Sequence, residues 1–145
     1  MATPTLTFGR MRNVVQIIHF AMCAGVGVFA VIAWMLMGKL DPNKDLPAGI
    51  LVTAGAALSL AAVAVSLGLP LLAQKHLAGR PLEVRLRSIV FARVLIAASL
   101  EAAALFWTVV ALLMQDPIVL AAAGVCLDIL IVAFPTQAKL EEAIG

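Results

Sequence analysis

The chain has 145 residues, of which 63% are hydrophobic and 12% are charged, against roughly 45–50% and about 25% in an ordinary soluble domain. This composition leaves too little polar surface to coat a fold in water, so it excludes a soluble domain and indicates an integral membrane protein. The formal net charge is +2, which does not favour nucleic acid, and no nucleic-acid partner is expected.

Four apolar runs along the chain approach or exceed the length that crosses a bilayer, about 20 residues of helix. Together they occupy most of the sequence, so we expect one membrane domain over residues 1–145. The predicted fold is all-α, a four-transmembrane-helix bundle with up-down topology. The expected spans are 14–37, 47–73, 88–114 and 118–134.

The last two spans have recognisable beginnings. From Pro81 an amphipathic stretch runs into the third span with Leu82, Leu86 and Ile89 on one face, so the third helix should be longer than the membrane requires. Asp116 precedes Pro117, and an Asp side chain can accept a free backbone N–H where proline lacks one. The fourth helix should therefore begin at Pro117, after a short turn that makes it the antiparallel neighbour of the third.

The basic residues are distributed unevenly between the two ends of the bundle. Short cytoplasmic loops keep an excess of Lys and Arg, so we expect both termini to be cytoplasmic and the chain to lie in a bacterial inner membrane, with the lipid bilayer as its main partner. Eight basic residues flank one side and two flank the other: Arg10, Arg12, Lys75, Arg80, Arg85, Arg87, Arg93 and Lys139 against Lys39 and Lys44.

Each span carries a stripe of small or polar residues at helical spacing. Helices in lipid associate through close packing of small side chains and through polar contacts, so these stripes are expected to face the centre of the bundle. In chain order they are Arg12, Gln16, His19, Cys23, Gly27 and Ala30; Gly55, Ser59, Ala62 and Ser66; Val94, Ala97, Glu101, Ala104 and Thr108; and Ala121, Gly124 and Asp128.

Two carboxylates lie near the middle of spans, Glu101 in the third and Asp128 in the fourth. An acid at that depth costs about 2.5–3.5 kcal/mol on insertion scales, so each should face protein. Similar depth on adjacent antiparallel helices predicts that the two lie close together. They form either a proton- or ion-binding site or a pair of protonated or hydrogen-bonded side chains that lock the helices together.

Three further polar residues support this site. His19 and Gln16 lie one turn apart in the first span, where we expect His19 to hydrogen-bond a neighbouring helix. Arg93 can extend toward the cytoplasm or pair with a carboxylate through water. A haem would usually need two axial ligands and the only other histidine, His76, falls in a loop, so no cofactor is expected.

The chain resembles two groups of membrane proteins. The first is a set of small bacterial four-helix membrane proteins of unknown function; this resemblance implies the fold and brings no activity. It rests on Ile17-Ile18-His19-x-Ala21-Met22-x-x-Gly25-Val26, Leu100-Glu101-Ala102-Ala103-Ala104-Leu105-Phe106 and Phe134-Pro135-Thr136.

The second resemblance is confined to the region around the third span. Glu101-Ala102-x-Ala104-Leu105, Val109-Val110-Ala111-Leu112-Leu113 and the loop Gly79-Arg80-Pro81-Leu82-Glu83 are similar to the carboxylate-bearing hairpin of the ATP synthase proteolipid subunit c. The resemblance implies that Glu101 corresponds to the ion-carrying carboxylate. That family's first helix has closely repeated glycines, whereas span 47–73 has only Gly49, Gly55 and Gly68, so the match implies a similar hairpin without a working rotor.

These observations predict a non-enzymatic membrane protein. No nucleophile-base pair or phosphate loop appears, so no catalytic residue is assigned. Cys23 and Cys126 lie within spans without a C-x-x-C or Cys–His cluster, so no metal site is expected. The leading interpretation is a membrane subunit or self-associating bundle, with a homo-oligomer or another membrane protein as partner. The alternative is a proton- or cation-coupled transporter or ion-translocating subunit that uses Glu101 and Asp128.

Overall fold

The computed structural model describes residues 8–40, 47–77, 79–136 and 138. This part of the chain folds into four α-helices: α1 (Phe8–Leu36), α2 (Ala48–Leu77), α3 (Leu82–Met114) and α4 (Pro117–Val132). The prediction of an all-α fold with four helices is confirmed. Three of them, α1 to α3, are long and apolar enough to cross a membrane, whereas α4 is a shorter apolar helix of 16 residues.

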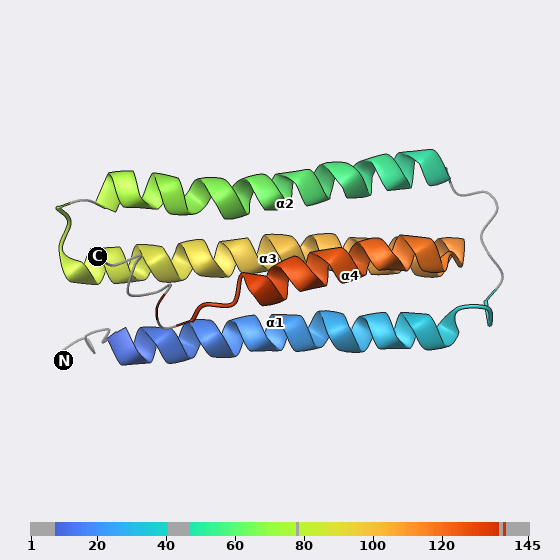
Figure 1. Cartoon of the computed structure of the whole chain (residues 1–145), viewed down its shortest axis with the longest axis horizontal. Coiled ribbons are helices and arrows are strands. Elements are labelled where there is room, and N and C mark those ends of the chain that lie inside the picture. The colour runs from blue at the N-terminus through green and yellow to red at the C-terminus, as the bar shows by residue number, and fades with distance from the viewer. Residues whose placement is uncertain (1–7, 41–46, 78, 137, 139–145) are drawn as a thin grey trace, which may run out of the picture.

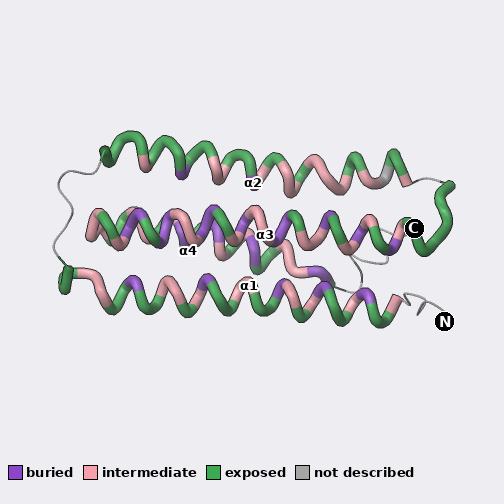
Figure 2. Tube along the Cα trace, turned by 180° about the vertical axis from the view of Figure 1, so that it is seen from behind, coloured by how far each residue is buried: buried purple, intermediate pink, exposed green. Residues whose placement is uncertain are grey.

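The third helix is the centre of the bundle. It packs against α1, α2 and α4, and α1 also packs against α4. Figure 1 shows α3 and α4 lying between α1 and α2, with successive helices running in opposite directions. The buried positions shown in purple in Figure 2 are concentrated on α3, because it packs against each of the other three helices.

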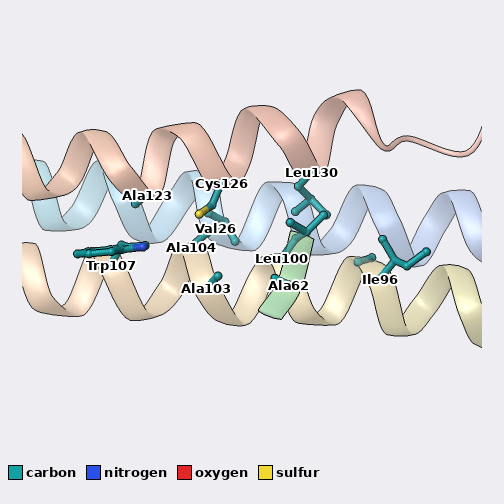
Figure 3. Packing of buried hydrophobic residues seen from close by; sticks show 11 residues of the cluster. Val26, Ala62, Ile96, Leu100, Ala103, Ala104, Trp107, Ala123, Cys126 and Leu130 are labelled. Atoms are coloured by element: carbon teal, nitrogen blue, oxygen red, sulfur yellow. The ribbon is translucent and has the colours of Figure 1, made fainter. Parts of the chain in front are cut away.

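The main core joins all four helices. Alanine supplies much of the surface of α3 at this core, so backbones approach closely and the larger side chains of the other helices fit against it. Figure 3 shows Leu130 of α4 beside Leu100, and Trp107 of α3 farther along the same face. The buried members are Val26, Ala62, Ile96, Ala97, Leu100, Ala103, Ala104, Trp107, Ala123, Cys126 and Leu130.

A second, smaller core joins the first turns of α1 to the first turns of α3. It consists of Met11 and Val15 with Leu86 and Ile89. The predicted amphipathic extension of the third helix is therefore present, and α3 runs without interruption from Leu82. Leu82 itself is exposed.

The turn between α3 and α4 has the predicted local chemistry. The Asp116 side chain accepts a hydrogen bond from the Ile118 N–H at 2.8 Å, and Pro117 occupies the first helical position. Gln115 takes the left-handed conformation (φ 53°) that ends α3. Its Oε1 also accepts a hydrogen bond from the Gly38 N–H at 2.6 Å, which ties this turn to the end of α1.

Candidate functional site

Glu101 lies on α3 where the buried face of the helix meets the exposed face. Its side chain is half-buried and points along α1, where a Cβ atom added to Gly25 would be 3.9 Å from Glu101 Oε1. Gly25 therefore leaves room for the carboxyl group against the α1 backbone. Within the part of the chain that the structure describes, no hydrogen bond or ion pair of this carboxyl group is seen. The predicted hydrogen-bond lock is thus not made by Glu101 among these residues.

Asp128 occupies a different environment. It is exposed on α4, on the side opposite Ala123, Cys126 and Leu130, which are buried. The prediction that Asp128 faces the interior is wrong, as is the inward placement of Ala121 and Gly124, which are also exposed. The whole predicted stripe of α4 is its outward face.

The packing of α3 against α4 explains why this stripe faces outward. A helix pair needs small side chains on only one partner for the backbones to approach. Here α3 supplies them with Ala103, Ala104 and other alanines, and α4 turns Leu130 and Cys126 toward that surface. The small residues of α4 are consequently left on the outside.

Glu101 and Asp128 lie at similar distances from the turn that joins their helices. Counting 1.5 Å per residue places Glu101 about 20 Å from Met114 and Asp128 about 17 Å from Pro117. Their faces differ, however: one carboxyl group is directed toward α1 and the other away from the bundle. They do not form a facing pair within one chain.

His19 and Gln16 cap the end of α4. Pro135 has no N–H, so α4 cannot continue, and the Phe134 N–H bonds the Ile131 carbonyl instead. His19, only 3% exposed, lies 2.7 Å from the Leu130 carbonyl through Nε2, which donates because a carbonyl can only accept. The interhelical hydrogen bond predicted for His19 is present.

Two further contacts strengthen this end of α4. The His19 ring meets Phe134 edge-on at 5.2 Å between ring centroids. Gln16 Nε2 donates to the Pro135 carbonyl at 3.1 Å. Arg93 lies half-buried on α3, two turns before Glu101. The predicted supporting residues therefore divide between a cap for α4 and a separate position on α3.

The sequence reasoning missed a polar contact between α2 and α3. Trp107 Nε1 donates to Ser59 Oγ at 2.9 Å, and Ser59 Oγ donates to the Gly55 carbonyl at 2.9 Å. The indole lies so close to α2 that a Cβ atom on Gly55 would come within 2.7 Å of it. The one-turn spacing of Gly55 and Ser59 is the sequence feature that could have indicated this packing site for an aromatic ring.

An apolar cavity of about 510 Å³ lies beside this contact, between α2, α3 and α4. Leu60 and Val63 of α2 and Val125 and Ile129 of α4 form much of its wall. The Cys126 thiol, also in the wall, is 3.8 Å from Ser59 Oγ. Such a lining can hold hydrocarbon and offers no charged group.

Among the described residues, no three His, Cys, Asp or Glu side chains come together in a way that could hold a metal ion. No family model, curated protein or solved structure matches the chain. The two resemblances drawn from the sequence therefore stay predictions.

Proposed function

We propose that this chain is an integral membrane protein without enzymatic activity, whose helices cross the bilayer and which self-associates through the outward face of α4. The length and hydropathy of α1, α2 and α3 support the crossing. So do the many large apolar side chains on the outside, such as Ile17, Phe20, Leu60 and Leu67, each more than 65% exposed. A water-soluble monomer rarely exposes apolar surface on this scale.

The fourth helix is too short to cross the hydrocarbon layer by itself. Its 16 residues span about 24 Å, against about 30 Å of hydrocarbon. In the segment after it, Ala133 to Pro135, the Pro135 carbonyl accepts a hydrogen bond from Gln16. Irregular backbone at membrane depth needs such protein partners, so His19 and Gln16 give α4 a workable end near the cytoplasmic surface.

The orientation follows from charge. The end of the bundle where α2 passes into α3 carries Lys75, Arg80, Arg85 and Arg87, so it belongs on the cytoplasmic side. In a variant with both native cysteines replaced, cysteines at Asn43 and Asp116 should react with an impermeant maleimide in intact cells. A cysteine at Gly79 should react only after permeabilisation, and its labelling in intact cells would reverse the orientation.

Asp128 is the single observation that carries the proposal of self-association. It is exposed near the middle of an apolar helix, where a carboxyl group facing lipid costs about 2.5–3.5 kcal/mol. A second copy related by a twofold axis along the membrane normal brings the same residue to the same depth. The two Asp128 side chains can then share one proton, which avoids two adjacent charges.

The residues beside Asp128 suit such a contact. Gly124 has nothing within 4 Å of an added Cβ atom, and Ala121 lies one turn farther along the same exposed face. Small side chains at this spacing let two helices approach closely in lipid. The α4 face, defined here as Ala121, Gly124 and Asp128, therefore combines a close approach with a polar contact.

Disulfide cross-linking in membranes tests this contact. In a variant lacking the native cysteines, Gly124→Cys should give a covalent dimer. The matched control is Leu60→Cys, which is also exposed but lies on α2, and it should not. Asp128→Leu should reduce cross-linking at position 124, while Asp128→Asn should retain it through amide hydrogen bonds. Equal cross-linking at positions 60 and 124 would contradict the proposal.

A proton- or cation-coupled carrier is the second candidate, and the position of Glu101 favours it. A half-buried carboxyl group beside Gly25, near the middle of α3, is a group that a proton carrier could load and unload. Glu101→Gln cannot titrate, so it should abolish proton-coupled uptake in proteoliposomes. Asp128→Asn is the control, and loss of uptake in that variant alone would move the carrier site to α4.

A further inference from the structure

The end of the bundle where α2 passes into α3 contains an open pocket that the proposed function does not use. Its volume is about 430 Å³, and it lies between the last turns of α2 and the first turns of α3. One part of its lining is apolar, with Leu69, Leu72 and Phe91. The other part is polar, with His76, Arg87 and Ser88.

The two parts of this pocket lie at different depths, if α2 and α3 cross the bilayer as proposed. Counting 1.5 Å per residue from the other end of each helix, Leu69 is about 32 Å from Ala48 and Phe91 about 35 Å from Met114. His76 and Arg87 are both about 40 Å from those ends. The hydrocarbon layer is about 30 Å thick, and the bilayer with its headgroups about 40–45 Å. The apolar part thus meets the edge of the hydrocarbon, and the polar part lies among the headgroups.

The polar groups are arranged to receive an anion. His76 was predicted to lie in a loop but is in the last turn of α2, where Nδ1 donates to the Leu72 carbonyl at 3.1 Å. The other ring nitrogen, Nε2, is then an acceptor, so it can accept a hydrogen bond from a hydroxyl group of a lipid headgroup. Arg87 is 68% exposed and forms an ion pair with Glu83 at 2.6 Å. Exposed pairs of this kind contribute little to stability, so a phosphate can replace the Glu83 carboxylate.

We infer that this pocket binds one anionic phospholipid of the cytoplasmic leaflet, and this inference rests on the proposed membrane insertion. The headgroup phosphate lies between Arg87 and Ser88, a headgroup hydroxyl donates to His76, and an acyl chain runs along Leu69 and Phe91. Basic pockets between helices at the cytoplasmic side suit such headgroups. Arg87 is the main determinant of headgroup binding, because a guanidinium group binds phosphate oxygens through two N–H groups.

The experiment uses the full-length protein, delipidated in detergent, with thermal unfolding measured as phosphatidylglycerol is added. Phosphatidylcholine tests the need for a negative charge, and soluble glycerol phosphate tests the need for an acyl chain. We expect stabilisation by phosphatidylglycerol alone. Equal stabilisation by glycerol phosphate would overturn the acyl-chain half of the inference.

Two variants that break the same ion pair supply the sharpest comparison. Arg87→Gln should weaken the apparent affinity for phosphatidylglycerol about tenfold, which corresponds to about 1.4 kcal/mol. Glu83→Gln frees Arg87 and removes a competing carboxylate, so it should strengthen the affinity. Arg80→Gln removes an exposed charge at the same end that does not line the pocket, and it should change little.

These outcomes separate this inference from the proposal on which it rests. If Arg80→Gln and Arg87→Gln weaken binding equally, the lipid responds to general charge and the pocket is not a site. If both glutamine variants of the ion pair behave alike, Arg87 does not hold the headgroup. A chain that carbonate strips from membranes would instead refute the proposed insertion itself.

Discussion

Two surfaces of the molecule contain the same kinds of residue: the face of α2 that contacts α3, and the outward face of α4. They differ in what packs against them. On α2, Gly55 and Ser59 receive the indole of Trp107. On α4, Gly124 and Asp128 face away from every other helix. One small-residue stripe is satisfied within the chain, and in the proposed dimer a second molecule would cover the other.

This difference shows that a stripe of small residues reveals an approachable surface without revealing its partner. Gly55 is buried with a ring atom 2.7 Å from the position of an added Cβ, whereas Gly124 has open space there. The two glycines therefore give opposite expectations for the same substitution.

Gly55→Leu should destabilise the folded chain strongly. The new side chain collides with the Trp107 indole and breaks its hydrogen bond to Ser59, and overpacking of this kind costs about 1–3 kcal/mol. Gly124→Leu should leave the free energy of unfolding within about 0.5 kcal/mol while reducing dimer formation. Thermal unfolding in detergent, followed by Trp107 fluorescence in a Trp34→Phe background, measures the first effect. Equal melting temperatures of the two variants in the monomeric state would show that the two stripes do not differ in this way.

His19→Leu should have the next largest effect. It leaves the buried Leu130 carbonyl without its donor, which costs about 1–2 kcal/mol in a membrane bundle. Gln16→Leu removes a less buried bond to Pro135 and should cost less than half as much. Unfolding in detergent measures both, and a larger loss for Gln16→Leu would show that the last turn of α4 does not depend on His19.

The helices themselves could be predicted because their causes are local. Asp116 and Pro117 begin α4 through contacts within three residues, and the apolar runs fix the helices by length. The inward face of α2 could also be predicted, since Gly55 and Ala62 are its buried positions. In each case the information lies within one turn or one helix.

The orientation of α4 could not be predicted in this way. The alanines of α3 determine which face of α4 turns inward, because a surface of small residues can pack against Leu130 as readily as against a glycine. The same limit applies to His19, whose partner carbonyl on Leu130 is free because the Phe134 N–H bonds the Ile131 carbonyl instead. Both facts depend on which helix lies opposite, which the sequence of one helix does not contain.

Glu101 should give the smallest effect on stability, and the sign of that effect separates its two roles. Its carboxyl group has no hydrogen bond to another helix among the described residues, so Glu101→Gln should change the free energy of unfolding by less than about 1 kcal/mol. Glu101→Leu should be no less stable than Glu101→Gln, because an apolar side chain beside Gly25 avoids the cost of placing an acid in the membrane. A loss with Leu that Gln does not share would show that a hydrogen bond, formed only in the membrane or in the dimer, holds Glu101.

The reactivity of Glu101 completes this test. An apolar carbodiimide modifies a protonated carboxyl group in the membrane, so labelling that rises as the pH falls and disappears in Glu101→Gln would favour the carrier. Gly25→Leu fills the space that the carboxyl group uses against α1, and it should reduce labelling while keeping the acid. If labelling instead persists in Glu101→Gln and is lost in Asp128→Asn, the reactive carboxyl group is the one on the outward face of α4. Glu101 would then be a tolerated polar residue, and the chemistry of this protein would lie at the contact between its two copies.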